Sequence, residues 1–137
     1  MQPRKQLISA LSLLLHGVHL FIIIFSVIGW MIPALRPYHL LLCILIAFSW
    51  FALGARKGWG YCLVTDWQWG LMRSMGVTDL PSSYMPMLYR FLTGHEGDDQ
   101  RIELVTRSVF FFSFLASLVV NRELLFKLPA IVGRYFF

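Results

Sequence analysis

LISALSLLLHGVHLFIIIFSVIGWMI, residues 7–32, is an unbroken run without a single charged side chain. A transmembrane helix needs about 20 consecutive apolar residues to cross the hydrocarbon core of a bilayer, and this run is longer. It also exceeds the apolar region of a cleaved signal peptide, so we expect it to be retained as a membrane span. The chain as a whole has the same character, because 58% of its 137 residues are hydrophobic and only 14% are charged. The sequence therefore predicts one integral membrane domain over residues 1–137 and excludes soluble folds.

Two further runs are long enough to cross a bilayer. Residues 38–55 carry no charge, and residues 104–121 carry a single charge, Arg107, in the first turn of the expected helix. Glu103 stands four residues before Arg107, which is the favourable order for an ion pair along a helix. The sequence thus predicts an all-α membrane protein with three transmembrane helices, at 7–32, 38–55 and 104–121.

The stretch GWGYCLVTDWQWGLMRSMG, residues 58–76, is either a fourth span or a helix at the membrane surface. As a span it would place Asp66 near the middle of the bilayer, at a cost of about 2.5–3.5 kcal/mol. A surface helix is the favoured interpretation, because Thr65 and Gln68 fit the S/T-x-x-E/Q capping box and the tryptophans suit the headgroup region. We expect an interfacial helix over residues 66–75, with four spans as the alternative.

A second short interfacial helix is expected over residues 86–93. Pro86 can occupy the first position of such a helix, and Gly94 can follow its last turn, as Gly76 can for the preceding helix. The acidic residues of the polar turn that follows suit the N-terminus of the third span, and this structural role is favoured over a cation site.

The positions of the basic residues predict the orientation of the spans. With three spans, one side of the membrane carries Arg4, Lys5, Arg56, Lys57, Arg73, Arg90, Arg101 and Arg107. The other side carries only Arg36, Arg122, Lys127 and Arg134. Because cytoplasmic loops carry an excess of lysine and arginine, we expect a multi-pass inner-membrane protein with a cytoplasmic N-terminus. The net charge of +5 is dispersed over the ends of the apolar runs, so the sequence does not predict nucleic-acid binding.

Polar side chains in the first span follow one narrow stripe. The stripe has spacings of 3, 4, 3 and 7 residues and consists of Ser9, Ser12, His16, His19 and Ser26. The third span has a matching stripe, formed by Thr106, Ser113, Ser117 and Asn121. The second span offers mostly small groups at helical spacing, namely His39, Cys43, Ala47, Trp50 and Gly54. We expect these stripes to face one another in the bundle.

Five of these side chains should share a level near the middle of the bilayer, if each helix rises 1.5 Å per residue. They are His16, His19, Cys43, Ser113 and Ser117, with His39 about one turn further out. One interpretation is a polar core that holds the helices together by hydrogen bonds. The other is a binding site, because ionisable residues inside a membrane often mark function. No cofactor and no metal site are predicted, and haem or quinone at this cluster is the alternative.

A second motif surrounds the interfacial helix and comprises Cys62, Thr65, Asp66, Gln68 and Arg73. With the upstream histidines, it resembles a family of small bacterial integral membrane proteins of unknown function. That family's pattern has one histidine in span one, another opening span two, and then W-x-C-P-L-T, an acidic residue and L-R before a glycine. The matching positions are His16 or His19, His39, Trp59 or Tyr61, Cys62, Thr65, Leu71, Arg73 and Gly76. Two positions depart from the pattern, because Leu63 replaces the proline and Gln68 replaces the glutamate.

The resemblance covers about residues 16–93 and implies a bacterial inner-membrane protein with about three spans. It implies no activity and no cofactor. The function that the sequence favours is therefore a non-enzymatic accessory or assembly subunit, which packs against another membrane protein or a second copy within the lipid bilayer. The alternative is a redox or lipid- and quinone-binding membrane component that uses the histidine and cysteine cluster.

Overall fold

A computed structural model describes residues 3–137 and shows them as helices joined by short loops, with no β-strand in that range. Met1 and Gln2, which the predicted domain includes, lie outside the described residues. Three helical stretches are long and apolar enough to cross a membrane: Pro3–Met31, Pro33–Lys57 and Asp99–Val120. The prediction of an all-α protein with three spans is confirmed.

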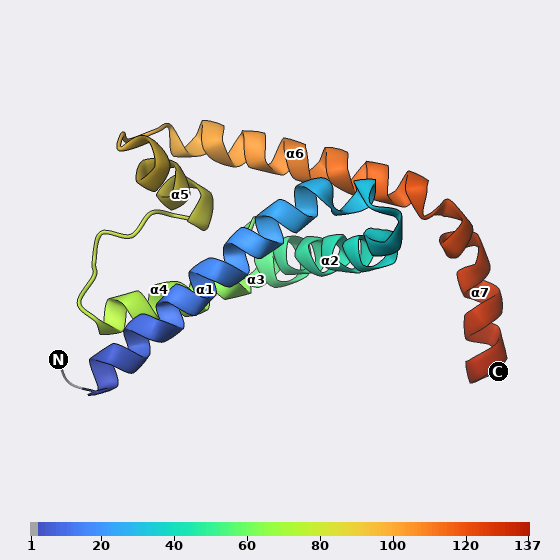
Figure 1. Cartoon of the computed structure of the whole chain (residues 1–137), viewed down its shortest axis with the longest axis horizontal. Coiled ribbons are helices and arrows are strands. Elements are labelled where there is room, and N and C mark those ends of the chain that lie inside the picture. The colour runs from blue at the N-terminus through green and yellow to red at the C-terminus, as the bar shows by residue number, and fades with distance from the viewer. Residues whose placement is uncertain (1–2) are drawn as a thin grey trace.

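The first two spans form a helical hairpin (Figure 1). The long helix α1 (Pro3–Ile28) passes through two 3-10 turns, η1 (Gly29–Met31) and η2 (Pro33–Leu35), into α2 (Arg36–Phe48). Proline at the start of η2 and of α2 fits the first turn of a helix, where its missing N–H is not needed. The second span then continues through a π-helical turn, η3 (Ser49–Leu53), into the short α3 (Gly54–Lys57).

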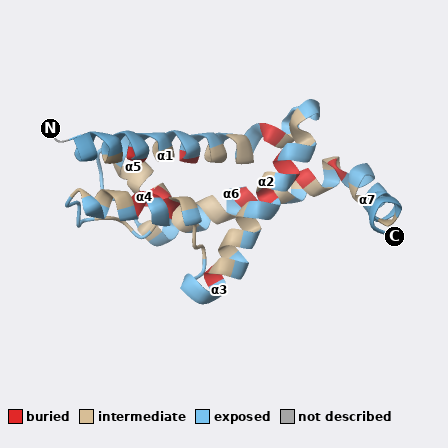
Figure 2. Cartoon of the chain, turned by 90° about the horizontal axis from the view of Figure 1, so that it is seen from below, coloured by how far each residue is buried: buried red, intermediate tan, exposed pale blue. Residues whose placement is uncertain are grey.

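Four further helices complete the chain. The third span, α6 (Asp99–Val120), packs against both α1 and α2, and α5 (Tyr84–Thr93) packs against α6. The helix α4 (Leu63–Ser74) lies alongside the N-terminal half of α1 (Figures 1 and 2). The last helix, α7 (Arg122–Phe136), turns away from the end of α6 and has no buried residue.

Little of this bundle is buried (Figure 2). Its buried residues are mostly polar, whereas those of a soluble protein are mostly apolar. Buried fractions of the three spans are only 11%, 22% and 17%, so most of their surface is left to lipid or to a partner. The buried positions are largely polar, and those on the spans include Ser12, His19, His39, Ser113, Ser117 and Asn121. Backbone and side-chain polar groups find no water in a bilayer, which explains why these side chains turn toward one another. Most of the predicted stripe residues therefore do face the interior of the bundle, but Ser9, near the start of the first span, is exposed.

The expected interfacial helices are present with shifted boundaries. Helix α4 ends in the expected way, because Gly76 has a positive φ of 92° and its N–H bonds the Arg73 carbonyl while Val77 bonds Met72. The predicted capping box is wrong. Helix α4 begins at Leu63, and no side chain caps its start.

Helix α5 begins at Tyr84, two residues before the proline that was expected to open it. That residue, Pro86, lies in the first turn and is buried, so its ring packs in the interior instead of marking the helix start. Gly94 follows the last turn in the left-handed conformation, as expected.

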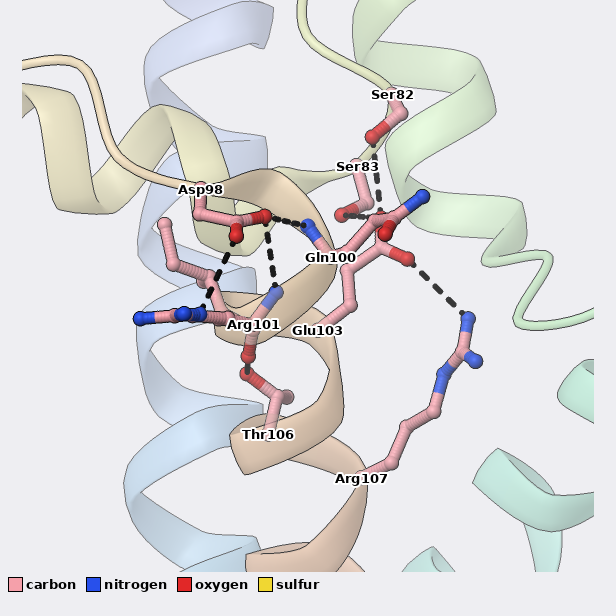
Figure 3. Close-up of polar contacts among 9 residues, drawn as sticks. Ser82, Ser83, Asp98, Gln100, Arg101, Glu103, Thr106 and Arg107 are labelled. Carbon is pink, nitrogen blue, oxygen red and sulfur yellow. Dashed lines mark hydrogen bonds and ion pairs between the residues drawn. The ribbon is translucent and has the colours of Figure 1, made fainter.

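The start of α6 is fixed by acidic side chains (Figure 3). Asp98 caps the helix by accepting hydrogen bonds from the backbone N–H groups of Gln100 and Arg101. The predicted ion pair between Glu103 and Arg107 is confirmed at 3.3 Å. Figure 3 also shows Ser82 and Ser83 bonding the other oxygen of Glu103, which holds the segment before α5 against α6.

Candidate functional site

The polar residues of the spans form two separate hydrogen-bonded groups. The His39 cluster lies where α1, α2 and α6 meet and contains His39, Cys43, Ser117 and Asn121, with the predicted Ser113 buried on α6 one turn before Ser117. The His19 cluster lies where α1 meets α4 and α5 and contains His16, His19, Cys62, Thr65, Gln68 and Tyr84. The prediction that five residues converge is wrong for Cys43 and Ser117, which contact His39 instead, whereas His39 does lie apart from His16 and His19, as expected. His39 binds Ser117 directly, and the two histidines of α1 bind α4 and α5 instead.

The residues of the His39 cluster are linked by a continuous series of hydrogen bonds. His39 Nε2 donates to the Ser26 carbonyl at 2.9 Å, so its Nδ1 is the acceptor for the Ser117 hydroxyl at 2.9 Å. Asn121 donates in turn to Ser117 Oγ at 3.3 Å and to the Arg36 carbonyl at 3.1 Å. Every ring nitrogen of His39 is thus occupied in joining three spans. The His39 cluster is therefore a structural joint between the spans. Cys43, one of the predicted site residues, is fully buried in it, with its sulfur 3.7 Å from the imidazole.

The His19 cluster begins with two hydrogen bonds from α1 to α4. His19 Nδ1 lies 3.1 Å from Gln68 Oε1, and its Nε2 lies 3.1 Å from Thr65 Oγ1. Because an amide oxygen can only accept, Nδ1 carries the proton and Nε2 offers its lone pair. Thr65 and Gln68 are three residues apart, the spacing that puts both on one face of a helix. The same two residues that matched a capping box therefore recognise a histidine.

Tyr84 covers the same imidazole from α5. Its ring stacks on that of His19 with centroids 3.9 Å apart and an angle of 9° between the planes. Its hydroxyl lies 3.3 Å from His16 Nδ1, and burial raises the pKa of the phenol above its ordinary value. Tyr84 was not among the predicted site residues. It follows a loop far along the sequence from His19, and nothing in its local pattern indicates this contact.

Gln68 carries the unusual feature of the cluster. The residue is 0% exposed, yet within residues 3–137 its amide Nε2 has no hydrogen-bond partner. An unpaired buried donor costs about 1–3 kcal/mol, so such groups are rare in proteins and often mark a binding or catalytic role. By this criterion the His19 cluster, and not the His39 cluster, is the candidate site.

Cys62 and the rest of the predicted interfacial motif lie at the edge of the His19 cluster. Cys62 Sγ is 3.7 Å from His19 Nε2, and the residue is half-buried. Asp66 is exposed and accepts a hydrogen bond of 2.8 Å from the Tyr61 hydroxyl, which raises the pKa of that phenol. Arg73 is exposed in the last turn of α4 and stands apart from the cluster. Within the described part of the chain, no three His, Cys, Asp or Glu side chains gather as metal ligands would.

Comparison with known proteins identifies a family. Residues 9–122 match the family model described as "Protein of Unknown function (DUF2784)", and the chain belongs to this family. The match covers all three spans together with α4 and α5, so both clusters lie inside it. No curated protein and no solved structure matches the chain.

Proposed function

We propose that this multi-pass membrane protein is an accessory or assembly subunit of the bacterial inner membrane, with its N-terminus in the cytoplasm. Its task is to pack against a second membrane protein or another copy of itself. The observation that carries the proposal is an aromatic face formed by the second and third spans.

The aromatic face consists of Trp50, Phe51, Trp59, Phe110 and Phe111. Trp50 lies 4.8 Å from Phe110, Phe51 lies 5.4 Å from Trp59, and Phe51 lies 6.2 Å from Phe111, measured between ring centroids. Three of the rings remain exposed, Phe51 to 45%, Trp59 to 70% and Phe111 to 38%. Large rigid aromatic side chains are enriched at protein interfaces, because they bury much area at a small cost in entropy.

The backbone beneath this face supports the same proposal. Trp50 and Phe51 belong to the π-helical turn η3, which interrupts an otherwise regular span. Such turns are rare and occur frequently at functional sites. Here the extra residue of the turn changes the direction in which following side chains point, and it brings Phe51 to both Trp59 and Phe111.

Photocrosslinking from the native membrane tests this proposal. Phe51 and Phe111 are replaced singly by p-benzoylphenylalanine, and Leu13, a strongly exposed residue of α1, is the matched control. A subunit should give one crosslinked band of fixed mass from both aromatic positions and none from the control. The proposal is refuted if all three positions give only lipid adducts.

A second candidate function is a redox or lipid- and quinone-binding component, which the unpaired amide of Gln68 favours. That amide would donate to a carbonyl or headgroup oxygen, and the same cluster holds further polar groups on His16, Thr65 and Tyr84. An absorption spectrum, metal analysis and organic extraction of the purified protein test this. Wild type should yield a haem band, a quinone or a stoichiometric lipid that is absent from Gln68→Leu, and recovery of the same compounds from both proteins would exclude the cluster as their site.

A further inference from the structure

Cys62 differs from the other cysteine in its surroundings. Cys43 is 0% exposed inside the His39 cluster, whereas Cys62 is half-buried at the edge of the His19 cluster. Cys62 has an extended backbone and directly precedes the first turn of α4. The residue is therefore partly exposed, and its sulfur lies 3.7 Å from Nε2 of His19.

The segment that presents Cys62 is held at two points. The Ser49 hydroxyl bonds the Tyr61 carbonyl at 2.9 Å, which ties residues 58–62 to η3. On the other side, Arg107 approaches Gly60 so closely that a Cβ atom there would lie 2.8 Å from the guanidinium. Gly60 also has a positive φ of 79°, so glycine is required for this turn. The thiol position is therefore set by the fold.

Neighbouring groups supply what a nucleophilic thiol needs. Gln68 Oε1 accepts from His19 Nδ1 and so fixes the tautomer that can take the thiol proton at Nε2. The first backbone N–H groups of α4, which have no acceptor inside the helix, follow Cys62 directly and can stabilise an oxyanion. The unpaired Gln68 Nε2 provides an additional buried donor beside the same imidazole.

An apolar groove runs along the same pair of helices. It has a volume of about 460 Å³ and is lined by Leu11, Leu14 and Leu15 of α1 with Trp67 and Leu71 of α4. Asp66 lies at its edge, and its backbone N–H bonds the Cys62 carbonyl at 3.0 Å. A long alkyl chain is the ligand that such a groove in a membrane protein would accept.

We propose that Cys62 is a site of S-acylation, to which a long-chain acyl thioester transfers its acyl group. His19 Nε2 accepts the Cys62 S–H proton, and the thiolate attacks the acyl carbonyl to form a carbon–sulfur bond. The carbon–sulfur bond of the donor breaks, and the departing thiolate takes the proton back from His19. The products are an acyl thioester on Cys62 and a free thiol, without any oxidant or reductant. The reacting residues of this site, Cys62 and His19, are not members of the aromatic face, and the acylation goes beyond the subunit function.

The experiment incubates the full-length protein in lipid nanodiscs with an alkyne-tagged palmitoyl-CoA. Bound acyl chain is measured by intact mass and by click labelling before and after neutral hydroxylamine, which cleaves thioesters. Wild type and the matched control Cys43→Ser should gain one hydroxylamine-sensitive acyl group, and Cys62→Ser should gain none. His19→Asn should slow the labelling on the order of 100-fold, the usual contribution of a general base.

Several results would overturn the proposal. Absence of label on wild type would do so, as would label that persists in Cys62→Ser or a rate in His19→Asn equal to wild type. Should His19→Asn fail to fold, Gln68→Met takes its place, because it removes the acceptor that fixes the His19 tautomer. Its labelling should slow, while alkylation of Cys62 by a small maleimide should show that the thiol is still accessible.

Discussion

Replacing Gly29 by alanine should destabilise the bundle through the His39 cluster. A Cβ atom at Gly29 would lie 2.8 Å from His39 Cδ2 and 3.0 Å from Phe25 Cε2. Real Cβ contacts are essentially never shorter than 3.0 Å, so the contact with His39 requires a shift, and the tight contact with Phe25 leaves little room for it. His39 cannot rotate without losing its bonds to Ser26 and Ser117, both 2.9 Å long.

The size of the effect follows from these contacts. Overpacking of a close-packed interior costs about 1–3 kcal/mol. Two hydrogen bonds between membrane helices add about 0.6 kcal/mol each. The free energy of unfolding of Gly29→Ala should therefore fall by about 2–4 kcal/mol relative to wild type, the sum of these two costs.

The assay is unfolding by sodium dodecyl sulfate in mixed micelles, followed by circular dichroism. Gly17→Ala is the matched control, because Gly17 lies in the same span and nothing stands within 4 Å of an added Cβ. Alanine is favoured over glycine in a helix by about 1 kcal/mol, so the control should be as stable as wild type or more so. Equal stability of the two alanine variants would refute the structural role of the His39 cluster. As a second check, combining Gly29→Ala with His39→Ala should cost less than the sum of the single changes, since truncating the ring removes the clash.

Two further predictions concern α4 and the segment before it. Trp69→Phe should lower the free energy of unfolding by about 1 kcal/mol, because the buried indole loses its 2.8 Å bond to the Pro81 carbonyl. Trp67→Phe, on the exposed side of the same helix, should change the free energy of unfolding by less than about 0.5 kcal/mol. Equal losses of stability in the two variants would argue against the bond between Trp69 and Pro81. Asp66→Asn should lower the pKa of Tyr61, since the hydrogen bond to the carboxylate raises it and the neutral phenol is the form that donates. Phenolate absorption at high pH, taken as the difference from Tyr61→Phe, should therefore begin at lower pH in Asp66→Asn, and an unchanged onset would contradict the bond.

The parts of the fold that sequence alone could predict are those set by local chemistry. Uncharged runs define the spans because a charge in the bilayer is costly, and the Glu103–Arg107 pair follows from helical spacing alone. Gly76 and Gly94 end their helices because both positions require a positive φ, which glycine adopts without strain. The periodic stripes also predicted which face of each span turns inward, since buried polar groups must find partners in a membrane.

The composition of the candidate site could not be predicted in the same way. Thr65 and Gln68 match a local capping motif worth about 1 kcal/mol, and nothing in the sequence says that His19 competes for the same side chains. Tyr84 stacks on His19 from a segment whose preceding residues, Ser82 and Ser83, are tied to Glu103 of a different helix, and local sequence does not show these contacts. Depth counted along straight helices grouped Cys43 and Ser117 with His16 and His19, whereas both contact His39 in the structure.

The two buried histidines then differ in a way that bears on chemistry. His39 has both ring nitrogens engaged, Nε2 with the Ser26 carbonyl and Nδ1 with the Ser117 hydroxyl, in a chain of hydrogen bonds that joins the three spans. The hydrogen bonds that join His19 to α4 come from side chains, and its Nε2 faces a hydroxyl and a thiol that can exchange as partners. The Nε2 lone pair of His19 can give up its hydrogen bond from the Thr65 hydroxyl and accept the proton of the Cys62 thiol instead. The tautomer is kept, because Gln68 still accepts the hydrogen bond from Nδ1. If a histidine of this protein takes part in chemistry, that difference selects His19, and the reactivity of Cys62 is the measurement that reports on it.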